Sequence, residues 1–151
     1  MSRRTFNINE PFREIQEEDS VKQFESKLLI ACGSTLNSLS LDNQGDKHVW
    51  VYDANDEILG VLVFIDHGTE FYVDMVSNNF TIPKSVLHET KPGSSLYQIM
   101  EDVAVMNGVS KITLDSIPDR VSYWQTQFGF KLSGTPSVGK FCRLFPMEKK
   151  I

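Results

Sequence analysis

Hydrophobic and polar residues recur with two periods along this chain, one typical of helices and one typical of strands. The clearest helical period follows Pro92, where apolar residues are spaced by three and four positions. This spacing puts the apolar side chains on one face of an α-helix. The helix is expected to end at Asn107-Gly108, because both residue types favour the left-handed conformation that ends helices. The residues that follow the helical spacing are Leu96, Ile99, Met100, Val103 and Ala104.

Alternating or β-branched runs predict six strands. Three of them follow one another in the middle of the chain and are separated only by short turn-forming segments, so we expect an antiparallel meander. These three are His48–Asp53, Glu57–His67 and Glu70–Val76. The other three are Phe12–Gln16, Lys111–Asp115 and Gly139–Met147.

Two more segments have helical patterns. A helix over 17–33 is expected, with Asp19 or Ser20 as its cap and Gly33 as its end, and a short helix over 119–128 is expected to stop at Gly129. Residues 34–47 are expected to form a loop or a short second helix, and the stretch from the third meander strand to Pro92 to be irregular. No repeat or linker divides the chain, so residues 1–151 are expected to form a single α/β domain with a mixed sheet.

Composition excludes some classes of function. A net charge of −5 and a pI near 5.2 provide no basic stripe for a phosphate backbone, so nucleic acid is not expected as a partner, whereas a cationic small molecule or basic peptide is compatible with the charge. No segment has the pattern of a leader or a membrane span, so a cytoplasmic protein is expected. Cys32, Cys142 and the three histidines have no metal-site spacing, so no metal is expected.

The order of these elements and four stretches of sequence resemble the GNAT family of acyl-CoA dependent N-acyltransferases. The stretches are "FREIQEEDSVKQFESKLL", "VWVYDANDEILGVLVF" with Gly60, "PGSSLYQIMEDVAVMNGVSKITLD" and "YWQTQFGFKLSG" with its Gly-Phe pair. The resemblance spans nearly the whole chain. It implies a mixed, mostly antiparallel central sheet of six to seven strands with helices on both faces.

The resemblance also implies a site for acetyl-CoA before the helix that follows Pro92. In the family, backbone N–H groups at this helix start bind the diphosphate, helped by the helix dipole. By that reading Gly93, Ser94 and Ser95 offer their amides, and Lys91 adds charge. The family loop is commonly Q/R-x-x-G-x-G/A, whereas here it reads "HETKPG", with His88 at the first position and Lys91 in place of the first glycine.

Further site residues follow from the resemblance. The strand end Met75, Val76 and Ser77 is implied to bind the pantetheine arm through backbone groups. A base is needed to take a proton from the acceptor amine. Glu70 and Asp74 share one face of the strand with Tyr72. Glu70 is the first choice, because in the histone-modifying branch of the family the base carboxylate precedes the coenzyme-contacting end of this strand by a similar interval, and Asp74 is the second. The alternative is that one or both acids are solvated strand-end residues.

Tyr123 is the implied acid that protonates the leaving thiolate, and its competing interpretation is core packing beside Trp124 and Phe128. Together these residues predict transfer of an acyl group, most readily acetyl, from acyl-CoA to a small-molecule or peptide amine by direct attack in a ternary complex. The alternative is a catalytically inactive GNAT-fold binding or regulatory protein. This alternative is suggested by Lys91 and Pro92 in the loop and by the length of the loop before them. Neither the acceptor nor a homodimer is decided by the sequence.

Overall fold

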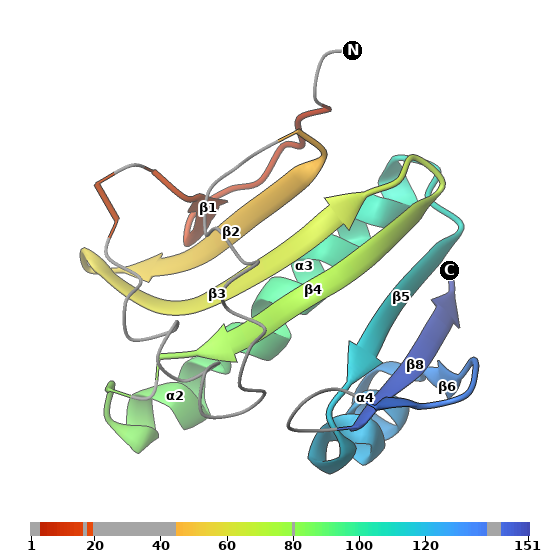
Figure 1. Ribbon diagram of the computed structural model, residues 1–151. Coiled ribbons are helices and arrows are strands. Elements are labelled where there is room, and N and C mark those ends of the chain that lie inside the picture. Colours follow the sequence, from red (N-terminus) through yellow and green to blue (C-terminus); the bar gives the residue numbers. More distant parts are fainter. Residues whose placement is uncertain (1–3, 17, 20–44, 80, 139–142) are drawn as a thin grey trace.

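The computed structural model describes residues 4–16, 18–19, 45–79, 81–138 and 143–151 (Figure 1). Its elements are β1 (Phe12–Glu14), β2 (Lys47–Ala54), β3 (Glu57–Asp66), β4 (Glu70–Asn78), α2 (Lys84–Thr90), α3 (Pro92–Met106), β5 (Lys111–Ser116), η2 (Pro118–Arg120), α4 (Val121–Phe128), β6 (Lys131–Leu132), β7 (Ser137–Val138) and β8 (Arg143–Lys150). The predicted helix over 17–33, apart from Glu18 and Asp19, and nearly all of segment 34–47 lie outside the described residues.

The described strands form one mixed sheet, which confirms the predicted fold class. Their order is β1-β2-β3-β4-β5-β8-β6, and β7 pairs with β8, which gives eight strands in the described part of the chain. Neighbouring strands run antiparallel except β4 and β5, which run parallel. The sequence did not predict β6 and β7, because a two-residue strand contains too little alternation to detect.

Two predicted segments differ in the structure. The stretch before Pro92 contains the helix α2, which begins after Pro83 and ends at the left-handed Lys91; it buries no residue, so no apolar period marked it. The closing strand, predicted over Gly139–Met147, runs over Arg143–Lys150 and so extends beyond its predicted end, whereas the predicted residues 139–142 lie outside the described part of the chain. Its charged end pairs with β5 on one side and β6 on the other, so backbone hydrogen bonds hold residues whose side chains predict no strand.

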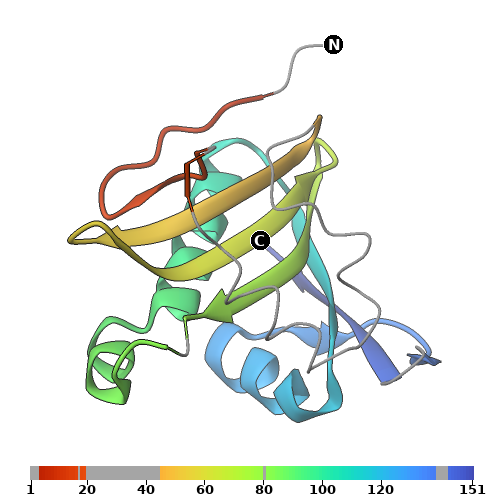
Figure 2. The same ribbon diagram turned by 60° about the vertical axis from the view of Figure 1, so that its left-hand side comes forward.

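The main core lies between the sheet and the two helices α3 and α4. Figure 2 shows α3 crossing one face of β2, β3 and β4. On that face the sheet contributes Trp50, Leu62, Phe64 and Phe71, all with 0% exposure. Each such side chain contributes about 1.5–3 kcal/mol relative to full exposure. The helices contribute Leu96, Tyr97, Met100 and Trp124.

Successive side chains along each strand alternate between the two faces of the sheet. Phe71 and Val73 of β4 face α3, so Glu70 and Tyr72 face the other way. That second face carries a separate buried cluster formed by β2, β3 and β4. Its members are Val49, Val51, Val61, Val63 and Met75.

Helix α3 lies close against the sheet at Gly60 of β3. A Cβ at this position would lie 2.7 Å from the Pro92 Cβ and 3.4 Å from a methyl group of Leu96, and the first of these distances is shorter than side chains tolerate. Glycine is therefore required here by the close approach of the first turn of α3. The position of α3 on the sheet in turn fixes the site described below.

Candidate active site

Strand β4 has no paired residue in either neighbouring strand at Asp74. Its parallel pairing with β5 runs from Glu70–Lys111 to Val73–Leu114 and ends there. On its other edge, β4 has a bulge: Val73 pairs with Phe64 and Met75 with Val63, so Asp74 has no partner in β3. Figure 1 shows β4 and β5 parting beyond this level. Among the described residues, the backbone of β4 after Val73 therefore has no strand on its β5 side, and bulges commonly mark active sites.

The first turn of α3 faces this end of β4. Lys91 precedes the helix with φ of 45° and ψ of 63°, so a lysine takes the left-handed conformation at the position where the family loop has glycine. Gly93 donates its backbone N–H to Oδ1 of Asn78 at 2.8 Å, and Ser95 donates its N–H to the carbonyl of Lys91 at 2.9 Å. Among the described residues the N–H of Ser94 has no hydrogen-bond partner. Of the three predicted amides, that of Ser94 is the one left for a ligand.

Tyr123 of α4 meets the same turn. Its hydroxyl shares a hydrogen bond with the hydroxyl of Ser94, so two predicted site residues far apart in sequence come together. The Tyr123 ring also packs edge-on against Trp124 and Phe128, with centroid distances of 5.2 and 5.7 Å. Trp124 is buried in the core, so the structure contains the packing contacts predicted for Tyr123, and its role as an acid stays a prediction.

The other predicted coenzyme residues take different positions. Val76 packs against the main core and Met75 belongs to the opposite cluster, so each offers backbone rather than side-chain groups to a ligand. Ser77 is buried, and its hydroxyl donates to the carbonyl of Asn78 at 3.1 Å. His88 lies exposed in the last turn of α2, and the Lys91 side chain is exposed beside the first turn of α3.

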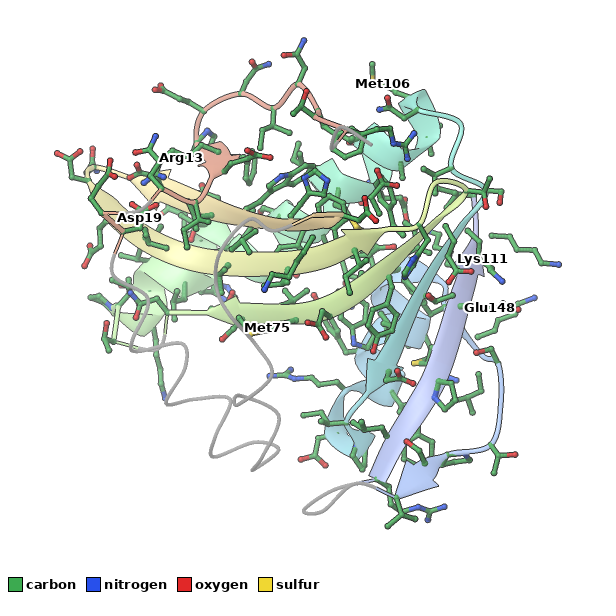
Figure 3. The ribbon with its side chains drawn as sticks, turned by 45° about the horizontal axis from the view of Figure 1, so that its top comes forward. Arg13, Asp19, Met75, Met106, Lys111 and Glu148 are labelled. Atoms are coloured by element: carbon green, nitrogen blue, oxygen red, sulfur yellow. The ribbon has the colours of Figure 1, made fainter. Side chains whose placement is uncertain are left out.

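The two candidate bases differ in their surroundings. Glu70 accepts a hydrogen bond from Thr113 at 3.1 Å and pairs with Lys111 at 3.3 Å, and Lys111 also lies 3.6 Å from Glu148 (Figure 3). Asp74 is half-buried, and burial raises its pKa above the usual range, with Lys47 acting in the opposite direction. A carboxyl whose charged form is disfavoured by burial, as that of Asp74 is, becomes a stronger proton acceptor.

Two further residues on this face were not predicted as site residues. The hydroxyl of Tyr72 donates a hydrogen bond to Oδ2 of Asp115 at 2.7 Å, linking β4 to β5 where their pairing ends. Burial, and after it the carboxylates of Asp115 and Asp74, raise the pKa of Tyr72. The sequence contained one signal for Tyr72, its parity with Glu70 and Asp74, but the position of Asp115 depends on the tertiary register.

Changing Asp74 to Asn is expected to stabilise the protein at neutral pH. Because the folded-state pKa of Asp74 is raised, the folded state holds its proton more tightly than the unfolded state. Ionisation of Asp74 therefore destabilises the protein as pH rises through that pKa. We expect the melting temperature (Tm) of Asp74→Asn to exceed that of the wild type by a few degrees at pH 7, and the difference to vanish near pH 3, where both states are protonated.

Glu70→Gln serves as the matched control for this measurement. Its carboxylate is paired with Lys111, so removing the charge should leave Tm unchanged or lower it slightly at pH 7. Equal Tm values for Asp74→Asn and the wild type across this pH range would contradict the assignment of a raised pKa.

Comparison with known proteins places this geometry in context. A model of the acetyltransferase (GNAT) domain matches residues 16–151. An aminoglycoside 6'-N-acetyltransferase solved with coenzyme A is 14% identical over 92% of this chain and 96% of that chain, with a TM-score of 0.62. A GNAT family acetyltransferase from Elizabethkingia anophelis with acetyl-CoA bound is 11% identical over 93% and 97%, with a TM-score of 0.64.

A third solved structure, an acyl-CoA N-acyltransferase from Pseudomonas aeruginosa, is 14% identical over 84% of this chain and 86% of that chain, with a TM-score of 0.63. At these identities the structural likeness shows the fold. The search of curated proteins gave no match. In the described part of the chain, no helix has the length and apolar character needed to cross a membrane.

Proposed function

The chain belongs to the GNAT acetyltransferase family, and from that premise we propose that it transfers an acetyl group from acetyl-CoA to an amine. The observation that carries the proposal is the contact of Tyr123 of α4 with Ser94 at the start of α3, whose amide has no hydrogen-bond partner among the described residues. Strand β4, with its bulge at Asp74, supplies the third group. In this proposal the Ser94 amide supplies an anion site, Asp74 supplies a base and Tyr123 supplies an acid.

The first turn of α3 fits a coenzyme diphosphate. The Ser94 N–H is unsatisfied among the described residues, and it lies at the positive end of a helix of 15 residues. Gly93 and Ser95 are small, so an anion can approach the backbone closely. The exposed Lys91 side chain adds a positive charge beside this turn. The unpaired β5-side edge of β4 after Val73 would hold the pantetheine arm by backbone hydrogen bonds.

The thioester of acetyl-CoA supplies the activated acyl group, and the residues of this chain move the protons. Asp74 takes the proton that the acceptor ammonium must lose before its lone pair can attack the carbonyl carbon. The C–N bond then forms and the C–S bond breaks. A second proton passes from the nitrogen to solvent as the amide forms, and Tyr123 donates its hydroxyl proton to the leaving thiolate and regains one from solvent. Glu70, held by Lys111 and Thr113, is the second candidate for the base.

One observation favours the alternative function, a GNAT-fold protein that binds ligands without turnover. The Gly93 amide already donates its hydrogen bond to the side chain of Asn78, so this amide is not available to an anion. Binding of a diphosphate at this turn then depends on the Ser94 amide, the helix dipole and Lys91. The two functions make opposite predictions for acetyl-CoA in the following experiment.

Acetyl-CoA at 100 times its dissociation constant is expected to stabilise the protein by about 2.7 kcal/mol, which raises Tm by roughly 5–10 °C. Thiol release from acetyl-CoA is then measured over a panel of primary amines and lysine-containing peptides. Ser94→Asp places a negative charge at the α3 start, where it repels a diphosphate yet suits the helix dipole. This variant should fold and lose the acetyl-CoA shift.

Ser133→Asp introduces the same charge at an exposed position after β6 and is the matched control, so its shift should equal that of the wild type. A Tm that does not respond to millimolar acetyl-CoA would rule out the transferase. A shift without thiol release from any amine would favour the alternative function.

A further inference from the structure

Tyr72 and Asp115 form a bridge between β4 and β5 on the face of the sheet opposite α3. The Tyr72 hydroxyl donates to Asp115 Oδ2 at 2.7 Å. Tyr72 pairs with Thr113 one position before the parallel pairing ends, and Asp115 is the first residue of β5 beyond it. Asp115 is exposed and Tyr72 is half-buried, so the bridge is accessible from solvent, and Asp74 lies two positions after Tyr72 on the same strand.

The hydrogen bond fixes what Tyr72 offers to a ligand. A phenol has one proton, and here that proton is directed at Asp115. The remaining capacity of the oxygen is its lone pairs, so toward a ligand Tyr72 acts only as a hydrogen-bond acceptor. The carboxylate also polarises the O–H bond, which strengthens the oxygen as an acceptor.

We propose that Tyr72 is a specificity-determining residue that accepts a hydrogen bond from the N–H of a cationic amine acceptor, and that Asp115 is the positioning residue that holds it. This inference rests on the proposed function, because it assigns the acceptor class of that reaction. A neutral or anionic group without a donor finds no complementary partner at Tyr72.

The same groups disfavour a carboxylate next to the acceptor amine. The carboxylates of Asp74 and Asp115 both act electrostatically on Tyr72, so a ligand at the Tyr72 hydroxyl faces two carboxyl groups, of which Asp74 is also influenced by Lys47. The nearby acids Glu70 and Glu148 are paired with Lys111, whereas Asp115 has no ion-pair partner among the described residues. The acceptor class is therefore an amine without an adjacent carboxylate, such as an aliphatic amine or a lysine side chain, rather than a free amino acid.

The test measures steady-state kinetics with the amine that the wild-type protein acetylates most efficiently. Tyr72→Phe keeps the ring and removes the lone pairs, so the KM for the amine should rise about 10-fold or more, as expected for loss of a hydrogen bond to a charged group. The KM for acetyl-CoA should stay unchanged. Tyr52→Phe, a matched change on the other face of the sheet, should leave both values unchanged.

The Asp115 variants separate positioning from folding. Asp115→Asn keeps an acceptor for the Tyr72 hydroxyl and should raise the amine KM only about 2–3-fold, whereas Asp115→Ala frees the hydroxyl proton and should approach the effect of Tyr72→Phe. All variants are compared for Tm and for the acetyl-CoA shift, so a variant that fails to fold is recognised. A merely structural bridge would change Tm without this graded change in the amine KM.

The outcomes distinguish this inference from the proposed function. A wild-type protein that releases thiol with an amine, while Tyr72→Phe has the same amine KM, overturns the inference and leaves the function standing. A wild-type protein that releases no thiol with any amine overturns the function and the inference with it. The inference that an adjacent carboxylate disfavours an acceptor amine is tested with phenethylamine and phenylalanine, which differ only in that carboxylate. Phenethylamine should have the higher kcat/KM, and equal values would overturn this part of the inference.

Discussion

Replacing Tyr123 by Phe is expected to lower kcat for acetyl transfer about 100-fold, the lower end of what a positioned acid or base contributes. The phenol hydroxyl is the group that would protonate the leaving thiolate. It contacts the first turn of α3 by a hydrogen bond with the Ser94 hydroxyl. The substitution keeps the ring, so its edge-on contacts with Trp124 and Phe128 are retained. The measurement is thiol release at saturating acetyl-CoA and amine.

Two controls make this result specific. The acetyl-CoA shift in Tm should be the same for Tyr123→Phe and the wild type, because the diphosphate site does not include the phenol. Ser94→Ala removes the hydroxyl that bonds Tyr123 and leaves the acid in place, so kcat should fall by less than about 10-fold. Turnover by Tyr123→Phe at the wild-type rate would leave Tyr123 with a packing role alone.

Gly60→Ala is expected to destabilise the protein by about 1–3 kcal/mol, because a Cβ there cannot be accommodated without moving the backbone of α3. The atom it meets is the Pro92 Cβ at 2.7 Å, which cannot rotate away as the end of a long side chain would. Tm should fall by roughly 5 °C in thermal unfolding. The acetyl-CoA shift should also shrink, since the displaced turn carries the Ser94 amide.

Gly134→Ala is the matched control for this prediction. A Cβ at Gly134 would lie 3.4 Å from its nearest neighbour, a Pro146 side-chain carbon, which is an ordinary contact. Its Tm is expected to stay within about 1–2 °C of the wild type. If Gly60→Ala proved as stable as Gly134→Ala, the close seating of α3 on β3 would be contradicted.

The sequence predicted the parts of the fold that are long and periodic. The meander β2–β4 and the helix α3 are confirmed, because their burial repeats with the period of a strand or a helix over many residues. Helix α2 escaped prediction because it is short and buries none of its residues. The bulge at Asp74 escaped too, since one unpaired residue in a strand leaves no mark that differs from ordinary alternation.

The candidate site was only partly predictable for the same reason. Ser94, Tyr123, and the candidate bases Glu70 and Asp74 were named with the help of a resemblance to a family, and the structure brings Ser94 and Tyr123 into contact. That Asn78 occupies the Gly93 amide, and that Tyr72 meets Asp115, depends on the register of β4 against α3 and β5. These long-range registers are set by the whole fold, and no local pattern of residues encodes them.

The cap that Asn78 provides has a consequence for how α3 forms. The side chain of Lys91, which precedes the helix, makes no capping hydrogen bond. The Gly93 amide of α3 instead donates to Asn78, a residue 15 positions earlier at the end of β4. A peptide covering α3 alone lacks this acceptor. The first turn of the longest described helix therefore gains the hydrogen bond of its Gly93 amide only after docking on the meander, which ties its formation to the cooperative folding of the sheet.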